Sequence, residues 1–223
     1  MSWKVKKDFL IIPHDNNIWF TMSKTCKRRL FLASKSERRI EILRKLGFEF
    51  TVLEPKEVEE THGDFKHLVV YNALSKAWSV SDMVDYGCIV AADTVVVLDG
   101  QVLGKPKSYD DAKRMLEALS GKWHLVVTGL AVVLIPEKLQ FTAVEETNVK
   151  FKTLTDKEIE FYLSTGEPFG KAGAYAIQGY ASLFVEKIEG CFFNVVGLPI
   201  KTLYELLKKA GVDVFDYIRL RVS

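Results

Sequence analysis

Short apolar runs and helically spaced apolar residues alternate along the chain from residue 30 onward. Residues 30–33 form an apolar run that predicts a buried strand. In residues 38–46, apolar side chains recur on one helical face, with Ser36 before them and Gly47 after them. This pattern predicts a helix that Ser36 caps and Gly47 ends.

The rest of the chain continues this alternation. Strand patterns occur at residues 48–53, 88–98, 101–103, 125–135 and 141–154. Helices are predicted for residues 65–84, for the segment that Ser108 caps, for residues 155–164 with a capping box, and for a segment from Pro199 to Gly211. Two more apolar segments, residues 183–188 and 192–196, follow a glycine-rich stretch.

A hairpin signal in the middle of the chain decides the type of sheet. Asp99-Gly100 separates the apolar residues 88–98 from residues 101–103, which favours a tight antiparallel turn. Strands and helices are otherwise interspersed, so a purely parallel doubly wound sheet is excluded. The sequence predicts a mixed α/β fold around a long sheet.

Residues 1–28 lack this regular pattern and end in a basic cluster. Two interpretations stay open for them. They form an extra strand or arm packed on the domain, or the first 21 residues are an artefact or tag and the natural start is Met22. We therefore treat residues 1–28 as an N-terminal extension and residues 29–223 as a single domain.

Composition narrows the class of protein. The chain has 223 residues, 48% of them hydrophobic, and 31 Lys and Arg against 29 Asp and Glu. Wholesale disorder is excluded, and a net charge of +2 gives no argument for binding nucleic acid or a membrane surface. The three cysteines form no CxxC pair, and no apolar run approaches the roughly 20 residues of a membrane span. We expect a reduced, cytoplasmic protein.

Asp93 is the polar residue that stands out, because it lies in the otherwise apolar strand 88–98. A buried carboxylate must be paired, hydrogen-bonded or bound to a metal. It is either an acid aimed into a cleft from a rigid strand, or an acid at a frayed strand end that backbone donors satisfy. The acidic loop with Glu57, Glu59 and Glu60 is a second source of carboxylates.

Several basic residues are candidates for binding an anion. Arg38 and Arg39 follow Ser34 and Ser36 at a predicted helix start, where backbone N–H groups and guanidinium groups favour an anion. Lys76 and Lys105 are further candidates. Mg²⁺ takes carboxylate and phosphate oxygens, so these acids and bases together suit a polyphosphate with a hard metal ion.

The series of motifs resembles the Maf family of nucleoside triphosphate pyrophosphatases. The matching segments are LASKSERRIEILRKLG (32–47), KA (76–77), AADTVV (91–96), LGKP (103–106), SGKWHLVVTG (120–129), GKAGAYAIQG (170–179) and NVVGLP (194–199). They occur in family order and cover residues 30–211. The resemblance implies an elongated fold of two lobes around a central cleft, and homodimers.

The resemblance also implies hydrolysis of the α–β phosphoanhydride, which releases a nucleoside monophosphate and pyrophosphate. Asp93 and Glu59 would hold Mg²⁺ or Mn²⁺ and the attacking water, with the base not assigned between them. The phosphates would bind to Lys76, Lys105 and Arg39, with Ser34 ahead of the arginine pair. Glu57 and Glu60 lie close enough to Glu59 to make that assignment the least secure.

Three positions resemble the branch of the family that acts on dTTP and UTP. These are Arg38, Lys171 and Gln178, and the branch for 7-methyl-GTP differs at the first and the last of them. Gln178 offers a donor and an acceptor that suit the edge of uracil or thymine. The alternative for Gln178 is an amide in water at a strand edge.

Two residues depart from the family pattern, and two other functions compete. Glu37 stands in place of a proline, and Gly170 in place of an aspartate. The competing functions are a nucleotide-binding regulator of septum formation with incidental hydrolysis, and the same hydrolysis on modified nucleotides. The presence of Asp93, Lys76 and Lys105 favours the enzyme.

Overall fold

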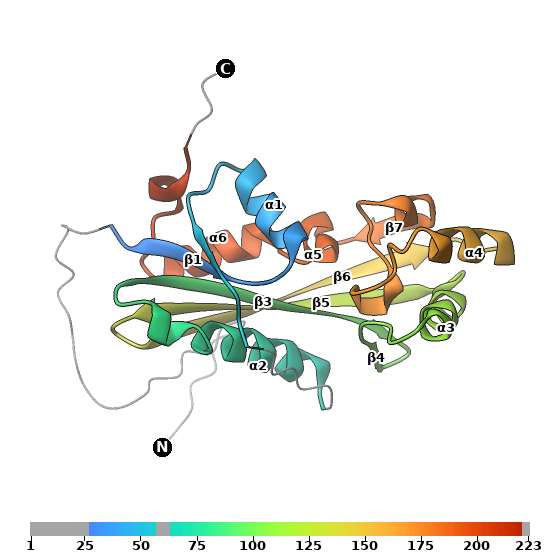
Figure 1. Cartoon of the computed structure of the whole chain (residues 1–223), viewed down its shortest axis with the longest axis horizontal. Helices are drawn as coiled ribbons and strands as arrows, with labels where there is room; N and C mark the ends of the chain where they lie inside the picture. The colour runs from blue at the N-terminus through green and yellow to red at the C-terminus, as the bar shows by residue number, and fades with distance from the viewer. Residues whose placement is uncertain (1–26, 57–62, 220–223) are drawn as a thin grey trace.

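The computed structural model describes residues 27–56 and 63–219, which form a seven-stranded sheet with helices on both faces (Figure 1). The strand order is β2-β1-β3-β5-β6-β7, and β4 pairs with β3. The strands are β1 (Arg29–Ala33), β2 (Thr51–Leu53), β3 (Gly87–Leu98), β4 (Gln101–Leu103), β5 (Trp123–Ile135), β6 (Leu139–Phe151) and β7 (Val185–Glu189). β1 is parallel to β2 and β3, and the other pairs are antiparallel. The mixed α/β prediction is confirmed.

The helices divide between the two faces of the sheet. They are α1 (Glu37–Lys45), α2 (Phe65–Trp78), α3 (Tyr109–Leu119), α4 (Asp156–Ser164), α5 (Phe192–Val196) and α6 (Ile200–Lys209). Figure 1 shows α2 along one face, α1, α5 and α6 on the opposite face, and α3 and α4 at one end of the sheet.

β3 is buried on both faces because helices cover both of them. Val90, Ala92 and Val96 join the core on the side of α1 and α6, whereas Ile89 and Ala91 join the core under α2. This explains why the strand is apolar apart from Asp93 and Thr94. Side chains alternate along a strand, so neighbouring polar residues of β3 point to opposite faces.

Most turns and helix caps agree with the local sequence patterns that predicted them. Asp99 and Gly100 both adopt positive φ angles of 50° and 78°, as the predicted hairpin requires. Ser108 accepts a hydrogen bond from the Asp111 N–H, and Thr155 forms the predicted capping box. Pro199 is the N-cap of α6 rather than its first residue.

Three predicted segments differ from the structure. Helix α2 ends at Trp78 instead of residue 84, because the Ser79 and Ser81 hydroxyls bond to nearby carbonyls and compete with the helical pattern. The predicted strand 48–53 is reduced to β2. Residues 192–196 form the short helix α5, an outcome that a short apolar run leaves open.

Residues 1–26 lie outside the described residues, so the interpretation of an N-terminal extension stays a prediction. Of that segment the structure describes Lys27 and Arg28, and Arg28 donates to Glu137 and to the Ile135 carbonyl. The division into two lobes also stays a prediction. Within residues 27–56 and 63–219, no helix is long and apolar enough to cross a membrane.

Candidate active site

One edge of β3 has a gap in the middle. β1 pairs with residues 87–91 and β4 with residues 96–98, whereas β5 pairs with the opposite edge along nearly the whole strand. Residues 92–95 of β3 therefore have no paired strand on the first edge in the part of the chain that the structure describes. The gap lies at the carboxyl end of β1, and open α/β sheets bind ligands at such strand ends.

A cavity of about 500 Å³ occupies this gap. Because the sheet is interrupted there, side chains from both faces of β3 line it, Asp93 from the α2 face and Thr94 from the α1 face. Seven lining residues are cationic and two are acidic. The cations are Lys35, Arg38, Arg39, Lys56, Lys76, Lys105 and Lys171, and the acids are Glu37 and Asp93. Such an excess of positive charge suits a polyanion.

Asp93 is the buried carboxylate of this cavity, with 6% of its surface exposed. Lys76 donates from Nζ to Oδ1 at 2.5 Å, and Asn72 donates from Nδ2 to Oδ2 at 3.1 Å. Both donors come from one face of α2, since they are four residues apart. Asp93 lies in the middle of β3 and is satisfied by side chains, which excludes the frayed strand end with backbone donors.

The start of α1 forms another wall of the cavity. Ser36 is the N-cap, but its hydroxyl makes no cap hydrogen bond. The buried Ser34 accepts a hydrogen bond from the Ser36 N–H instead, at 3.1 Å. The first N–H groups of a helix have no partner inside the helix and attract anions. The predicted helix start is confirmed, and it lies beside the basic cluster.

Arg39 ties α1 to the sheet and to the end of α5. Its Nε donates to the Gly197 carbonyl at 2.7 Å, and its Nη2 donates to Thr94 Oγ1 at 2.9 Å. Thr94 in turn shares a hydrogen bond of 2.9 Å with Thr128 on β5. Two of the Arg39 nitrogen atoms therefore position the cavity wall, and direct contact of Arg39 with a phosphate stays a prediction.

Arg38 and Lys171 bring two partly dehydrated cations together. Burial lowers the pKa of Arg38, and the nearby Glu167 carboxylate opposes this shift. Burial lowers the pKa of Lys171 as well, and the Arg38 charge lowers it further. Lys171 also donates to the Phe169 carbonyl at 3.0 Å. Two like charges that line one cavity and repel each other favour a ligand rich in acceptors between them.

The structure brings most of the predicted site residues to one cavity. Ser34, Arg38, Arg39, Lys76, Asp93, Lys105 and Lys171 all line it. So do Glu37 and Gly170, the two departures from the family pattern. Gln178 is exposed and outside this lining. Glu59 falls outside the described residues.

Asn72, Lys35 and Lys56 belong to the site although sequence reasoning missed them. The spacing of four residues between Asn72 and Lys76 was a usable signal, because it places an amide and an ammonium on one helical face. Lys35 and Lys56 had no comparable signal, since isolated lysines are usually in water.

A divalent metal ion fits this site only in part. No group of three His, Cys, Asp or Glu residues that could hold a metal occurs within residues 27–56 and 63–219. Asp93 supplies one hard carboxylate to the cavity. Mg²⁺ commonly binds through one or two carboxylates together with substrate phosphates and water, so a single carboxylate suits an ion that arrives with a polyphosphate.

Fold and site together define a class: an α/β protein with a basic cavity that suits a polyanion and contains one buried carboxylate. The Maf-like protein model matches residues 29–210. The chain belongs to the Maf-like protein family.

Several relatives cover nearly the same region. A dTTP/UTP pyrophosphatase of Carboxydothermus hydrogenoformans is 46% identical over 184 residues, 82% of this chain and 99% of the relative. A dTTP/UTP pyrophosphatase of Thermosipho africanus is 47% identical over 82% of this chain and 94% of the relative. A solved structure, that of the Staphylococcus aureus Ham1 protein, has a TM-score of 0.42 at 13% identity and covers 56% of this chain and 72% of its own.

Proposed function

We propose that the protein is a nucleoside triphosphate pyrophosphatase of the dTTP/UTP type. The observation that carries the proposal is the basic cavity around Asp93, in which seven cations surround a carboxylate held in a fixed position. The family match and relatives of 43–47% identity named dTTP/UTP pyrophosphatase support the same activity. Water would attack the α-phosphorus, and the α–β bond would break to give a monophosphate and pyrophosphate.

The cations of the cavity would bind and orient the triphosphate. Lys105 and the start of α1 offer donors to phosphate oxygens, and charge-assisted hydrogen bonds of this kind contribute roughly 1.5–3 kcal/mol each. Negative charge accumulates on pyrophosphate as it leaves, so cations fixed before the reaction lower the barrier. Lys76 is already fixed by Asp93, which keeps its ammonium in place at the cavity wall.

Asp93 would orient the attacking water and accept its proton. Each of its oxygens accepts one hydrogen bond from α2 and keeps further acceptor capacity. Because Lys76 and Asn72 fix the carboxylate, its direction toward the substrate is set before the substrate binds. Glu59 would be the second carboxylate, as the resemblance implies.

A divalent metal, Mg²⁺ or Mn²⁺, belongs to this proposal as well. Asp93 would hold it, with Glu59 as the second protein ligand. When bound, such an ion neutralises phosphate charge and lowers the pKa of a bound water.

In this proposal Arg38, Lys171 and Gln178 recognise the nucleobase of the substrate. Arg38 and Lys171 lie together in the cavity and offer donors to the carbonyl oxygens of a pyrimidine. Gln178 would have to turn toward the cavity to take part. A single methyl group separates thymine from uracil and contributes only about 1 kcal/mol, so both nucleotides should react.

The decisive experiment measures pyrophosphate release from canonical and modified triphosphates with Mg²⁺, for the wild type and for Asp93→Asn. Asparagine keeps the shape and loses the charge and basicity, so we expect a fall in kcat of about 10²–10⁴-fold. Asp82→Asn, at an exposed aspartate, is the matched control and should react normally. A chelator should abolish activity, and Mg²⁺ or Mn²⁺ should restore it.

Full activity of Asp93→Asn would refute the proposed mechanism. A preference for purine nucleotides would refute the assignment of the nucleobase-binding residues. A wild type that binds triphosphates without hydrolysis would support the regulator instead. A cytoplasmic location and a homodimer stay predictions that rest on composition and on the resemblance.

A further inference from the structure

A buried histidine stands directly behind the cavity wall. His124 lies near the start of β5, is 3% exposed, and has its Nε2 2.9 Å from the Tyr175 hydroxyl oxygen. Val126, two residues further on the same face of β5, lines the cavity. Phe151 packs edge-on against both rings, with centroids 5.0 Å from His124 and 4.9 Å from Tyr175.

Tyr175 belongs to a segment that has little regular structure to hold it. Residues 167–181 contain only short 3₁₀ turns, and they carry Phe169, Lys171 and Tyr175 into the cavity lining. The segment is held by the burial of Ala174, Tyr175 and Ile177 in the core and by scattered hydrogen bonds, such as Gly173 N–H to the Gly104 carbonyl at 3.0 Å. Among the residues that the structure describes, His124 is the hydrogen-bond partner of the Tyr175 hydroxyl.

His124 is well suited to be a fixed partner. Burial lowers its pKa to about 4, so the imidazole is neutral near pH 7. Its Nδ1 has no hydrogen-bond partner among the residues that the structure describes, so Tyr175 is the group that orients the ring. The two aromatic neighbours, Phe151 and Tyr175, restrict it further.

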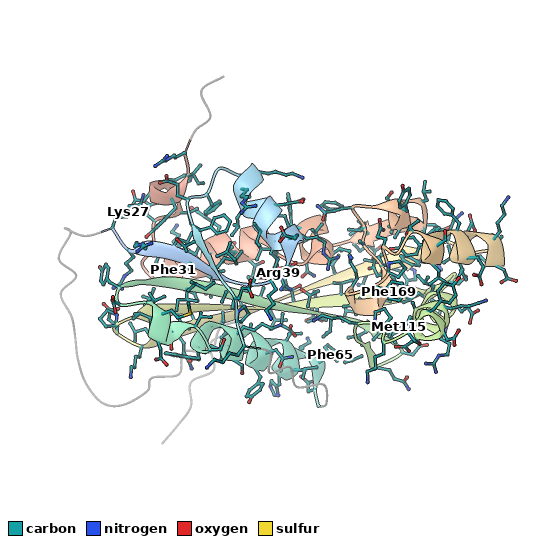
Figure 2. The ribbon with its side chains drawn as sticks, viewed as in Figure 1. Lys27, Phe31, Arg39, Phe65, Met115 and Phe169 are labelled. Carbon is teal, nitrogen blue, oxygen red and sulfur yellow. The ribbon has the colours of Figure 1, made fainter. Side chains whose placement is uncertain are left out.

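The chemistry of the cavity differs between its walls. Ser34, Lys76 and Lys105 supply a hydroxyl and two ammonium groups for phosphates, whereas Phe169 and Tyr175 supply aromatic surface. A nucleoside has an aromatic base and the phosphates do not, so the aromatic wall is the place for the base. In Figure 2, Arg39 and Phe169 lie on the same side of the sheet, Arg39 near α1 and Phe169 toward α4.

We propose that His124 is a positioning residue for base selection, which acts by holding the ring of Tyr175 at the nucleoside end of the cavity. This inference rests on the proposed function, because it assumes a nucleoside triphosphate as the substrate. A fixed ring limits the width available to the base and so favours a pyrimidine over the larger purine. If the ring is released, the wall can move and the limit is relaxed.

The test compares Tyr175→Phe, His124→Phe and His124→Gln with the wild type, using dTTP and dGTP. The two phenylalanine variants keep a ring and lose the hydrogen bond. We expect KM for dTTP to rise about three- to tenfold with kcat within about twofold, and the dTTP-to-dGTP ratio of kcat/KM to fall. His124→Gln retains a donor and an acceptor, and it should recover part of the selectivity.

Tyr217→Phe is the matched control, since Tyr217 is a buried tyrosine outside the cavity lining. It should change the melting temperature at most, with both KM values unchanged. Unchanged KM and unchanged selectivity in folded Tyr175→Phe and His124→Phe would overturn the inference while the wild type still hydrolyses dTTP. A wild type that releases no pyrophosphate from any triphosphate would overturn the proposed function and this inference with it.

Discussion

At the scale of single residues, a fixed ion pair lies in the cavity and a buried neutral histidine lies behind its wall. Lys76 donates a hydrogen bond to one oxygen of Asp93, and Asn72 donates to the other. The two charged groups therefore keep their positions without a ligand. His124 is different, because it is buried among rings and has no acidic partner in residues 27–56 and 63–219. Desolvation therefore disfavours its protonated form in the folded protein.

This burial predicts a loss of stability in mild acid. The pKa of His124 is lowered from 6.5 to about 4, so between these values the unfolded state binds a proton that the folded state does not. The stability that the folded protein gains from keeping His124 neutral is fully present above pH 6.5, and it is lost as the pH falls toward 4. From pH 7 to pH 5 we expect a loss of roughly 2 kcal/mol in the free energy of unfolding.

Urea unfolding at pH 7 and pH 5 measures this loss, and His124→Gln is the comparison because it cannot titrate. The variant should be less stable at pH 7 but should lose about 2 kcal/mol less between the two pH values. Identical pH dependence of the two proteins would show that another group is responsible.

At the scale of elements, the close contact of α2 with β5 positions Asn72 and Lys76 beside Asp93, the carboxylate proposed to be catalytic. A Cβ atom on Gly129 would lie 2.4 Å from the Val69 carbonyl carbon and oxygen in the backbone of α2. Gly129 is also the register partner of Asp93. The glycine thus lets the helix approach the sheet closely, where Asn72 and Lys76 reach the carboxylate.

Gly129→Ala is therefore expected to push α2 away from the sheet. Backbone cannot move aside as a flexible side chain can, so we expect a cost near the upper end of the 1–3 kcal/mol that is typical of overpacking, about 3 kcal/mol. Activity should fall more than the folded fraction explains, because Lys76 moves relative to Asp93. Urea unfolding and kcat at a temperature where the variant is folded measure the two effects.

Gly104→Ala is the control for this substitution, since a Cβ there meets no atom within 4 Å. It should leave stability within about 0.5 kcal/mol of the wild type. Equal costs at positions 104 and 129 would contradict the steric explanation.

Among these elements, the turns and caps could be predicted from the sequence, whereas the pairing of the strands could not. Asp99-Gly100 and the capping box at Thr155 are local signals, and the chain adopts both as expected. The gap at residues 92–95 depends on how far β1 and β4 pair along β3, and no local pattern contains that register. Asp93 is recognisable in the sequence as a buried acid. The spacing of Asn72 and Lys76 places both on one helical face, but only the packing of α2 against β3 shows that this face meets Asp93.

At the scale of the whole molecule, charge is distributed unevenly. The net charge of +2 is small for 223 residues, yet seven Lys and Arg residues face one cavity with two acids. The near-neutral composition gives no argument for a nucleic-acid surface, and an average over the chain cannot detect a local excess of positive charge. A field confined to a cavity acts on a ligand over about one Debye length, roughly 10 Å at 0.1 M salt.

Salt should therefore weaken substrate binding without slowing the chemistry. The Debye length falls from more than 10 Å at roughly 50 mM monovalent salt to less than 5 Å at roughly 500 mM. Over this range we expect KM for dTTP to rise several-fold while kcat changes little. Lys56→Gln removes one cation of the cavity and should make this dependence shallower. Lys208→Gln removes an exposed lysine of α6 outside the cavity lining and should leave it unchanged. Equal slopes for the two variants would mean that overall charge, rather than the cavity, attracts the triphosphate.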